Sequence, residues 1–275
     1  MEERRRWEDM EMDCLVNIIR RLSLEDLALG VPFVCKGWQR ASMEPLCWSI
    51  LDFRDLDFMP WSDLTKKFTA RYAVQRFSFS GFLKFALARS CGFAVELQFP
   101  LVFGASFQDL VFASEECPRL KTLVLPNILL ADEPLIPQLV GKWKELEKLE
   151  MELKPSSFSE MVMQINLNCR RFSGLRMFGS IKKEDVKAII KYLPKIKHLN
   201  LSKSYLQKEE LVEIIKGCRE LETLSVNNCI GFEADEEEVL RRASAIKNFE
   251  NEGSKLFDES AYDMDECDPL NVLVI

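Results

Sequence analysis

The chain has 275 residues and a net charge of −7, from 37 Lys and Arg against 44 Asp and Glu. Its apolar share of 47% and charged share of 29% are typical of a globular protein and exclude disordered, collagen-like and membrane-protein compositions. The acidic balance argues against nucleic acid as a partner, because such binding needs a basic surface that displaces counterions. No run approaches about 18 consecutive apolar residues, so we expect no membrane-spanning helix and no membrane partner.

The chemistry-bearing residues are few and scattered. His198 is the single histidine, which excludes a metal site or catalytic triad that needs two, and we expect it on the surface. Nine cysteines include no Cys-x-x-Cys pair and follow no signal-peptide run, which predicts reduced, mostly buried thiols in the nucleus or cytoplasm. No glycine-rich phosphate loop occurs, and no Arg/Lys cluster suggests a ligand pocket. We therefore expect no catalytic, metal or cofactor residues and no enzymatic activity.

The first fifty residues predict a three-helix unit. Leu15, Ile18, Ile19 and Leu22 have the spacing of one apolar stripe on a helix over residues 12–22. Ser23 and Asp26 resemble a capping box that opens a second helix ending near residue 30. Pro32 suits the first turn of a third helix, whose apolar face comprises Val31, Val34, Cys35, Trp38 and Ala41. A unit this small cannot bury all these groups by itself, so part of the stripe either packs on the rest of the chain or faces a partner protein.

These residues also carry a family resemblance. Residues 10–22 are similar to the opening of an F-box, which continues through Glu25-Asp26-Leu27, Val34-Cys35-Lys36-Gly37-Trp38 and Pro45-Leu46-Cys47-Trp48. Trp7-Glu8-Asp9 resembles the leader of plant F-box proteins with leucine-rich repeats. The resemblance implies binding to the Skp adaptor, and through it to a cullin, of an SCF ubiquitin ligase. The expected adaptor-binding residues are Leu15, Ile18, Leu22, Leu27, Val34 and Trp38. Some of these six could instead form the core of the F-box.

The middle of the chain repeats a Leu-x-x-Leu-x-Leu pattern. Its clear copies are 120/123/125, 146/149/151, 196/199/201 and 221/224/226, and its weaker ones are 74/77/79, 94/97/99 and 175/178/180. The middle positions of consecutive copies are separated by roughly 20–29 residues, which is the range of leucine-rich repeats. Helices are expected between the strands over residues 135–143, 158–169, 184–193 and 208–218. A non-repeating α/β domain with coincidental leucines is the alternative.

The predicted fold class is α/β, with an F-box (residues 5–50), a linker (51–70) and a solenoid of about seven irregular repeats (71–232). Parallel strands line the inside of the arc and helices its outside. Residues 233–275 carry 13 acidic and 4 basic side chains, which predicts an acidic, partly disordered tail, although residues 237–249 could form a helix. The strand face predicts contacts to an unknown target protein through Glu150, Glu152, Asn200, Ser202, Ser225 and Asn227.

Two hypotheses of different class follow. The first is a non-catalytic, substrate-recruiting subunit of an SCF ligase, which docks through its F-box and holds a target on its repeats. The second is a leucine-rich-repeat scaffold whose acidic tail binds basic proteins. The scaffold hypothesis accounts better for residues 233–275 but leaves the F-box pattern without a role.

Overall fold

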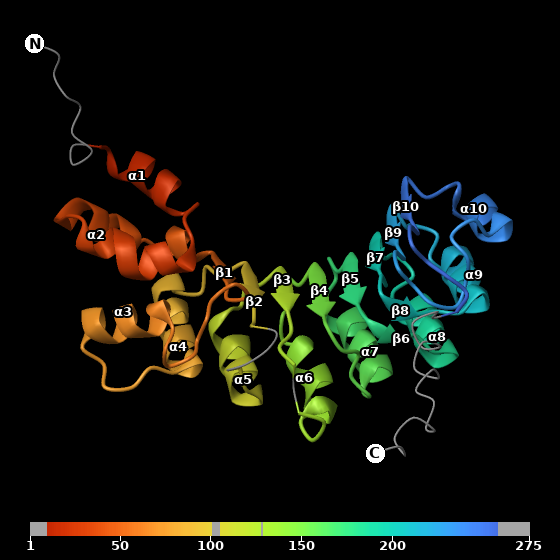
Figure 1. The fold of residues 1–275 in the computed structure, drawn as a ribbon, viewed down its shortest axis with the longest axis horizontal. Coiled ribbons are helices and arrows are strands. Elements are labelled where there is room, and N and C mark those ends of the chain that lie inside the picture. The colour runs from red at the N-terminus through yellow and green to blue at the C-terminus, as the bar shows by residue number, and fades with distance from the viewer. Residues whose placement is uncertain (1–9, 101–104, 128, 258–275) are drawn as a thin grey trace, which may run out of the picture. The chain divides into compact units, whose positions relative to one another are not determined.

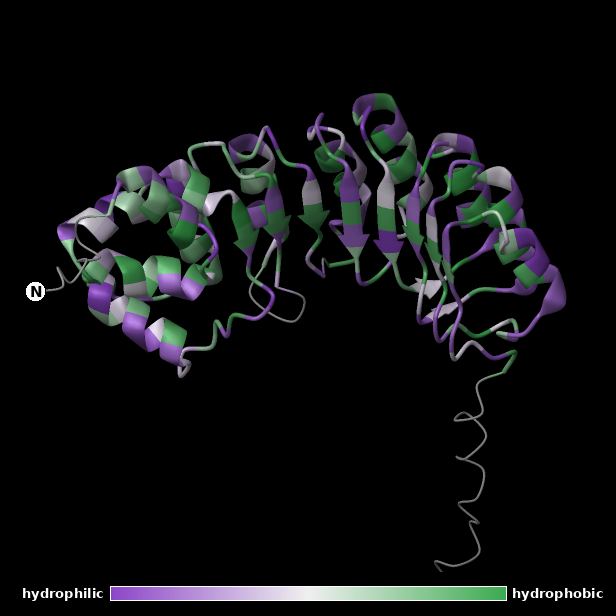
Figure 2. Cartoon of the chain, turned by 90° about the horizontal axis from the view of Figure 1, so that it is seen from above, coloured by the Kyte–Doolittle hydropathy of each residue, from purple (hydrophilic) through white to green (hydrophobic). Residues whose placement is uncertain are grey.

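The computed structural model describes residues 10–100, 105–127 and 129–257. The chain divides into two compact units, one ending at Gly174 and the other beginning at Leu175. Each unit combines parallel strands with helices, which confirms the predicted α/β class (Figure 1). Apolar and polar residues alternate along the strands and helices of both units, as Figure 2 shows.

The first unit opens with the short helices of the F-box region. Helix α1 spans Met12–Ile19 and α2 spans Lys36–Ser42. The predicted extension of α1 to residue 22 is wrong, because the amides of Arg21 and Leu22 bond carbonyls three residues back and tighten the chain into a turn. Between α1 and α2 lie a wide helical turn, Asp26–Gly30, and a tight one, Val31–Phe33.

Part of the capping box predicted at the second helical segment is present. The Asp26 amide donates to Ser23 Oγ at 3.1 Å, and that hydroxyl donates to the Asp26 carboxylate at 2.9 Å. The predicted start of the third helix at Pro32 is wrong. Cys35 has an extended backbone (φ −159°, ψ 170°), which separates the proline turn from α2.

Four parallel strands of the first unit stack their leucines. They are β1 Ile50–Asp52, β2 Glu96–Gln98, β3 Thr122–Val124 and β4 Lys148–Met151. Leu51, Leu97, Leu123 and Leu149 pair in register and are at most 1% exposed. The helices are α3 Asp63–Tyr72, α4 Phe79–Ser90, α5 Phe107–Glu116, α6 Ile136–Val140 and α7 Phe158–Asn168. Helices α5 and α6 lie beneath β2–β4 in Figure 1.

An aromatic cluster fills the core behind β1. Phe53 meets Phe79 edge-on at 5.4 Å and Phe82 at 6.0 Å between ring centroids, and Phe68 contacts Phe82 at 5.3 Å. The predicted repeat copy at 74/77/79 is wrong, because Phe79 begins α4, whose amide at Gly81 is capped by the Ser78 hydroxyl. The first strand is instead β1, so residues 51–70, expected to be a linker, contain a strand and most of α3.

The second unit continues the same construction. Strands β5 Gly174–Met177, β7 His198–Asn200, β9 Thr223–Ser225 and β10 Asn248–Glu250 lie side by side in that order. A small second sheet pairs β6 Gly179–Ser180 with β8 Ser204–Tyr205. The helices are α8 Lys183–Tyr192, α9 Lys208–Gly217 and α10 Glu237–Ala243.

The repeat at β5 has a different register from the predicted one. Leu175 and Met177 are buried, whereas Phe178 is only half-buried. The copy is therefore Phe172-x-x-Leu175-x-Met177, which begins earlier than the predicted 175/178/180. With this correction the central positions of the repeats, which are 97, 123, 149, 175, 199, 224 and 249, recur at a nearly constant interval.

The expectation of a tail beginning at residue 233 is wrong for residues 233–257. They contain α10, which confirms part of the helix allowed over residues 237–249, and β10, whose Phe249 pairs with Leu224 as one more repeat. Residues 258–275 lie outside the described part of the chain.

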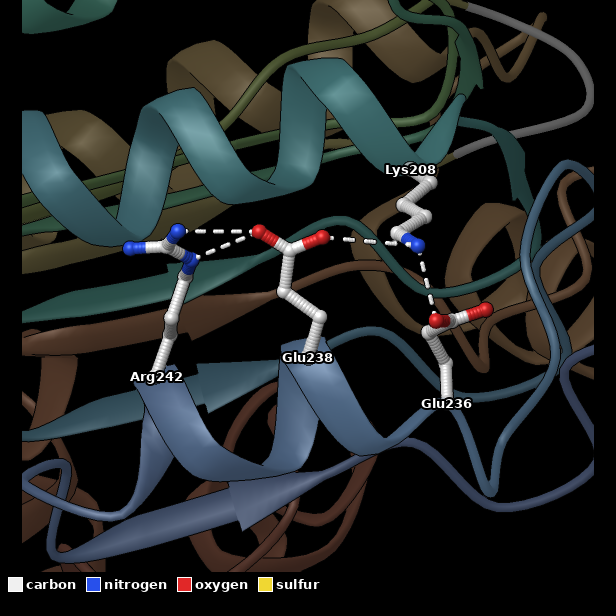
Figure 3. Close-up of polar contacts among 4 residues, drawn as sticks. All are labelled: Lys208, Glu236, Glu238 and Arg242. Atoms are coloured by element: carbon white, nitrogen blue, oxygen red, sulfur yellow. Dashed lines mark hydrogen bonds and ion pairs between the residues drawn. The ribbon is translucent and has the colours of Figure 1, made fainter.

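Salt bridges connect the acidic run 235–238 to the preceding repeat (Figure 3). Lys208, at the start of α9, lies 2.7 Å from a carboxylate oxygen of Glu236 and 3.4 Å from one of Glu238. Arg242 lies one helical turn after Glu238 and contacts it at 2.9 Å. These hydrogen bonds from Arg242 and Lys208 lower the pKa of Glu238. One lysine of the preceding repeat thus joins the acidic run to its neighbouring repeat within the second unit.

Replacing Lys208 with Met should loosen the last repeat, because Glu236 and Glu238 then repel each other without a shared cation. We expect amide hydrogen exchange over residues 237–250 to become several-fold faster. Lys216→Met, at an exposed lysine in the last turn of α9, is the matched control. Equal exchange in the two variants would contradict this account of the acidic run.

A second group of salt bridges, centred on Glu222, makes the stability of the second unit depend on pH. Glu222 lies 3.0 Å from Lys197 and 2.9 Å from Lys247, and hydrogen bonds from Lys247 and Lys197 lower the pKa of Glu222 from 4.5 to about 2. A lowered carboxyl pKa stabilises the folded state above pH 4.5, and the effect is lost as the pH falls through about 2. In Glu222→Gln, unfolding free energies should therefore drop below the parent's at pH 6 and converge with them near pH 2. Glu252→Gln serves as the exposed control, and a parent–variant difference that does not change with pH would refute the pairing.

Candidate functional site

The F-box region has a compact core of its own. Leu15 and Ile19 of α1 are buried, as are Leu27 and Trp48. The indole N–H of Trp48 donates to the Ser42 carbonyl at 2.7 Å, which ties the end of α2 to the turn Pro45–Trp48. This core sets which apolar side chains remain outside it.

Trp48 also joins the F-box region to the first repeat helix. Its ring meets Phe85 of α4 edge-on at 5.6 Å between centroids, and the Arg89 guanidinium lies 5.6 Å from its ring centre. The turn that contains Trp48 is followed directly by β1. One side chain thus belongs to the F-box core and to the start of the repeats.

Six large apolar side chains of the described residues that precede β1 remain exposed. We refer to them as the exposed F-box set: Ile18, Leu22, Phe33, Val34, Met43 and Leu46, each between 38% and 59% exposed. Covering the exposed half of one such side chain contributes about 1 kcal/mol. A partner would therefore need to cover several of them to form a stable complex.

Burial divides the predicted adaptor-binding residues. Ile18, Leu22 and Val34 belong to the exposed F-box set, and Trp38 is half-buried. Leu15 and Leu27 are only 3% and 1% exposed, so we correct these two to core residues. Helical spacing placed Leu15 and Ile18 on one apolar stripe. A stripe this wide can face both the protein core and the solvent, so the spacing does not show which residue is buried.

Comparisons with known proteins agree with this architecture. No family model matches the chain. It is 30% identical over 229 residues to an F-box/LRR-repeat protein of Arabidopsis thaliana, covering 82% of this chain and 72% of the relative. The chain belongs to the F-box/LRR-repeat protein family. It is also 24% identical over 245 residues to the Arabidopsis F-box protein SKIP1 and 25% identical over 242 residues to F-box protein FBW2, covering 79% and 71% of those relatives.

The strand face of this F-box protein carries a polar ladder between repeats. Ser225 Oγ and Asn227 Nδ2 both donate to the Glu250 carboxylate, at 2.8 and 3.3 Å. The Asn227 amide donates to Ser202 Oγ at 3.1 Å, and Asn127 Nδ2 donates to Glu152 at 2.8 Å.

The predicted target-binding residues are therefore engaged within the protein. Ser225 is buried, and the side chains of Glu152, Asn200, Ser202 and Asn227 are half-buried in these internal bonds. Glu150 lies in β4, also half-buried. A target would have to compete for the ladder bonds, so their first role is to join adjacent repeats.

The buried thiols of the described part of the chain are held in their unreactive, protonated form. Burial raises the pKa of Cys117 to about 12 and that of Cys47, Cys169 and Cys218 to about 11, so these thiols stay protonated and pack as apolar groups. His198 is exposed, with Nδ1 3.3 Å from Thr223 Oγ1. Within the described ranges, no three His, Cys, Asp or Glu side chains gather as a metal site. Nor does any helix there have the length and apolarity to cross a membrane.

A basic cleft in the first unit was missed by the sequence analysis. Its volume is about 540 Å³, and it is lined by Lys144, Glu145, Leu167, Asn168, Arg170 and Arg171. No local Arg/Lys cluster predicts it, because Lys144 and Arg170 belong to different repeats and lie far apart in the sequence. The repeat period makes residues at that separation neighbours, so aligning the repeats with one another would have revealed the cleft.

Replacing Trp48 with Phe should destabilise the first unit. The substitution removes the donor to the Ser42 carbonyl and leaves a small cavity, which together cost about 2–4 kcal/mol. Trp61→Phe is the matched control, because Trp61 is 68% exposed and should change stability by less than about 0.5 kcal/mol. Urea unfolding midpoints measure both, and equal midpoints would show that Trp48 does not join the two regions.

Proposed function

We propose that this protein is the substrate-recruiting subunit of an SCF ubiquitin ligase. Its F-box docks on a Skp-type adaptor, which links it to a cullin, and its repeats hold a target protein. The exposed F-box set is the observation that carries the proposal. Six half-exposed apolar side chains lie within residues 18–46, and a partner that covered several of them would gain apolar burial.

In this role the protein acts by positioning a target protein and not by catalysing a reaction. We assign no catalytic residue to this chain, because ubiquitin transfer belongs to other subunits of such a ligase. It raises the effective concentration of the target near the ubiquitin-loaded enzyme, because a target held on the repeats encounters that enzyme within one complex. The contact of Trp48 with Phe85 supports this role, because it joins the docking region to the first repeat helix.

We place the protein in the nucleus or the cytoplasm. Cys47, Cys117, Cys169, Cys218 and Cys229 are free and buried, with several thiols close to backbone carbonyls, such as Cys169 Sγ at 3.2 Å from the Trp143 oxygen. Reduced thiols used in this way suit a reducing compartment. Residence in either compartment is compatible with ligase assembly.

The alternative of an acidic scaffold for basic proteins receives less support. Glu236 and Glu238, in the centre of the acidic run, are paired with Lys208 and Arg242. Their charge is used inside the second unit, so it is not available to attract a basic partner.

Capture on an immobilised Skp-type adaptor tests the proposal. We expect the parent chain to bind and Ile18→Asp/Val34→Asp to lose at least about 30-fold in affinity, because about 2 kcal/mol of apolar burial is lost and two carboxylates are desolvated. Both residues are exposed, so the variant should keep its fold, as circular dichroism would check. Leu153→Asp/Leu240→Asp makes the same chemical change at exposed leucines outside the F-box.

Two results would contradict the proposal. Failure of a folded parent chain to bind the adaptor would remove the docking role altogether. Equal loss of binding in the F-box variant and in the control would mean that the exposed F-box set is not the contact surface.

A further inference from the structure

We propose that the free edge of β10 is a docking surface for residues 266–275 of the same chain, which add one more strand to the sheet of the second unit. Strand β10 is the last in that sheet, after β5, β7 and β9 (Figure 1). The inference does not depend on the proposed function, because it concerns contacts within one chain. Both the open end of the repeats and the sequence of residues 266–275 point to it.

The last described repeat has an incompletely covered core. Phe249 of β10 is half-buried, whereas its counterpart in the preceding repeat, Leu224, is fully buried. Ile246 is also half-buried, whereas its counterpart Leu221 is buried. Each repeat of a solenoid is covered by the next, and the final one needs a cap. The side of β10 that faces away from β9 is therefore the side with apolar surface left to cover.

Two equivalent phenylalanines show the same difference. Parallel bridges join residues 205, 230 and 255 of successive repeats, so Phe232 and Phe257 occupy equivalent positions two residues after the last two of these. Phe232 is 1% exposed and Phe257 is 65% exposed. This difference is expected if Phe257 lacks, among the described residues, the following repeat that Phe232 has.

The backbone next to β10 offers a hydrogen-bond donor to a further strand. In earlier repeats the amide two residues after the central position donates to a carbonyl of the following strand. These bonds run from Phe99 to Val124, from Leu125 to Glu150 and from Val226 to Glu250, at 3.2, 2.9 and 2.7 Å. The equivalent amide after β10 is that of Asn251, which has no backbone acceptor within the described residues. A parallel strand on β10 would supply one.

Residues 266–275 repeat the sequence of a described strand and its approach. They read Glu-Cys-Asp-Pro-Leu-Asn-Val-Leu-Val-Ile, and residues 116–125, which contain β3, read Glu-Cys-Pro-Arg-Leu-Lys-Thr-Leu-Val-Leu. The shared residues include both leucines of the repeat pattern, with Leu273 at the central position. Leu273 follows Phe249 at the same interval that separates Leu199 from Leu175. The motif therefore predicts pairing of Leu273 with Phe249.

A recurring cysteine supports the same register. One stands at the same distance before the central leucine in four described repeats, as Cys91, Cys117, Cys169 and Cys218, and Cys267 has this position relative to Leu273. Three of the four are buried. Cys169 Sγ lies 3.2 Å from the carbonyl of Trp143, the residue with the same position in the preceding repeat. In the docked strand the Cys267 thiol would pack in the same way on Ala243, which makes it a reporter of docking.

The connecting chain is long enough to reach the edge of β10. From Phe257 to Leu273 it has one residue fewer than from Phe232 to Phe249, a segment that includes α10 and still returns to the sheet. The occupant is therefore this chain itself. A strand edge left free invites pairing with other molecules, and a strand from the same chain prevents it.

Thiol labelling of the full chain tests the docking. Iodoacetamide reacts with accessible thiols, and mass spectrometry of the peptides gives the rate at each cysteine. We expect Cys267 to react at least tenfold more slowly than the exposed Cys14 in the native protein, and at a similar rate in concentrated urea. Leu273→Asp should raise the native rate at Cys267 at least tenfold, because a carboxylate cannot enter the core.

Val272→Asp is the matched control, one residue away. The position before the central leucine is exposed in the described strands, as at Lys148, His198 and Asn248, so this variant should keep Cys267 protected. Two results would overturn the inference. One is labelling of Cys267 as fast as that of Cys14 in the native parent, and the other is an equal effect of Val272→Asp and Leu273→Asp.

Amide exchange measured by NMR reports on β10 itself. We expect the Asn251 amide to exchange at least tenfold faster in a chain that stops at Asp265 than in the parent, while the Leu125 amide of the first unit stays unchanged. Equal exchange at Asn251 in the two chains would contradict docking at this edge. Protection that appears only as a dimer forms at higher protein concentration would assign the strand to a second copy and overturn docking within one chain.

Discussion

The leucine ladder is the constraint on which the rest of the structure depends. Leu97, Leu123 and Leu149 in the first unit, and Leu199 and Leu224 in the second, pair in register and are buried. A one-residue slip of any strand would turn its leucine away from the core and expose it. The ladder therefore fixes which residues of consecutive repeats become neighbours, each one repeat period from the next.

Several side chains brought together in this way are complementary. Lys121 lies 3.2 Å from Glu147, Lys197 lies 3.0 Å from Glu222, and Ser225 bonds Glu250. The corner of Lys144 and Arg170 departs from this rule, because it brings like charges to one cleft.

Sequence reasoning succeeded where one local pattern determines one local structure. Leu-x-x-Leu-x-Leu located β3, β4, β7 and β9, and Ser23 with Asp26 located a helical turn. It failed where distant contacts decide. Phe249 replaces the expected leucine in the last repeat, and the acidic run before it pairs with Lys208, which belongs to the preceding repeat. Composition alone could not reveal that partner, just as it could not separate buried Leu15 from exposed Ile18.

The exposed F-box set and the basic cleft both belong to the first unit. Trp48 is buried between the Ser42 carbonyl and the ring of Phe85, and β1 begins just after it. From β1 the paired leucines continue without interruption to β4, where the cleft begins. Close-packed cores of this kind transmit position because they deform little. A protein segment held on the strands of the first unit would therefore keep a defined position relative to a partner on the exposed F-box set, which is the geometric requirement for a subunit that acts by proximity.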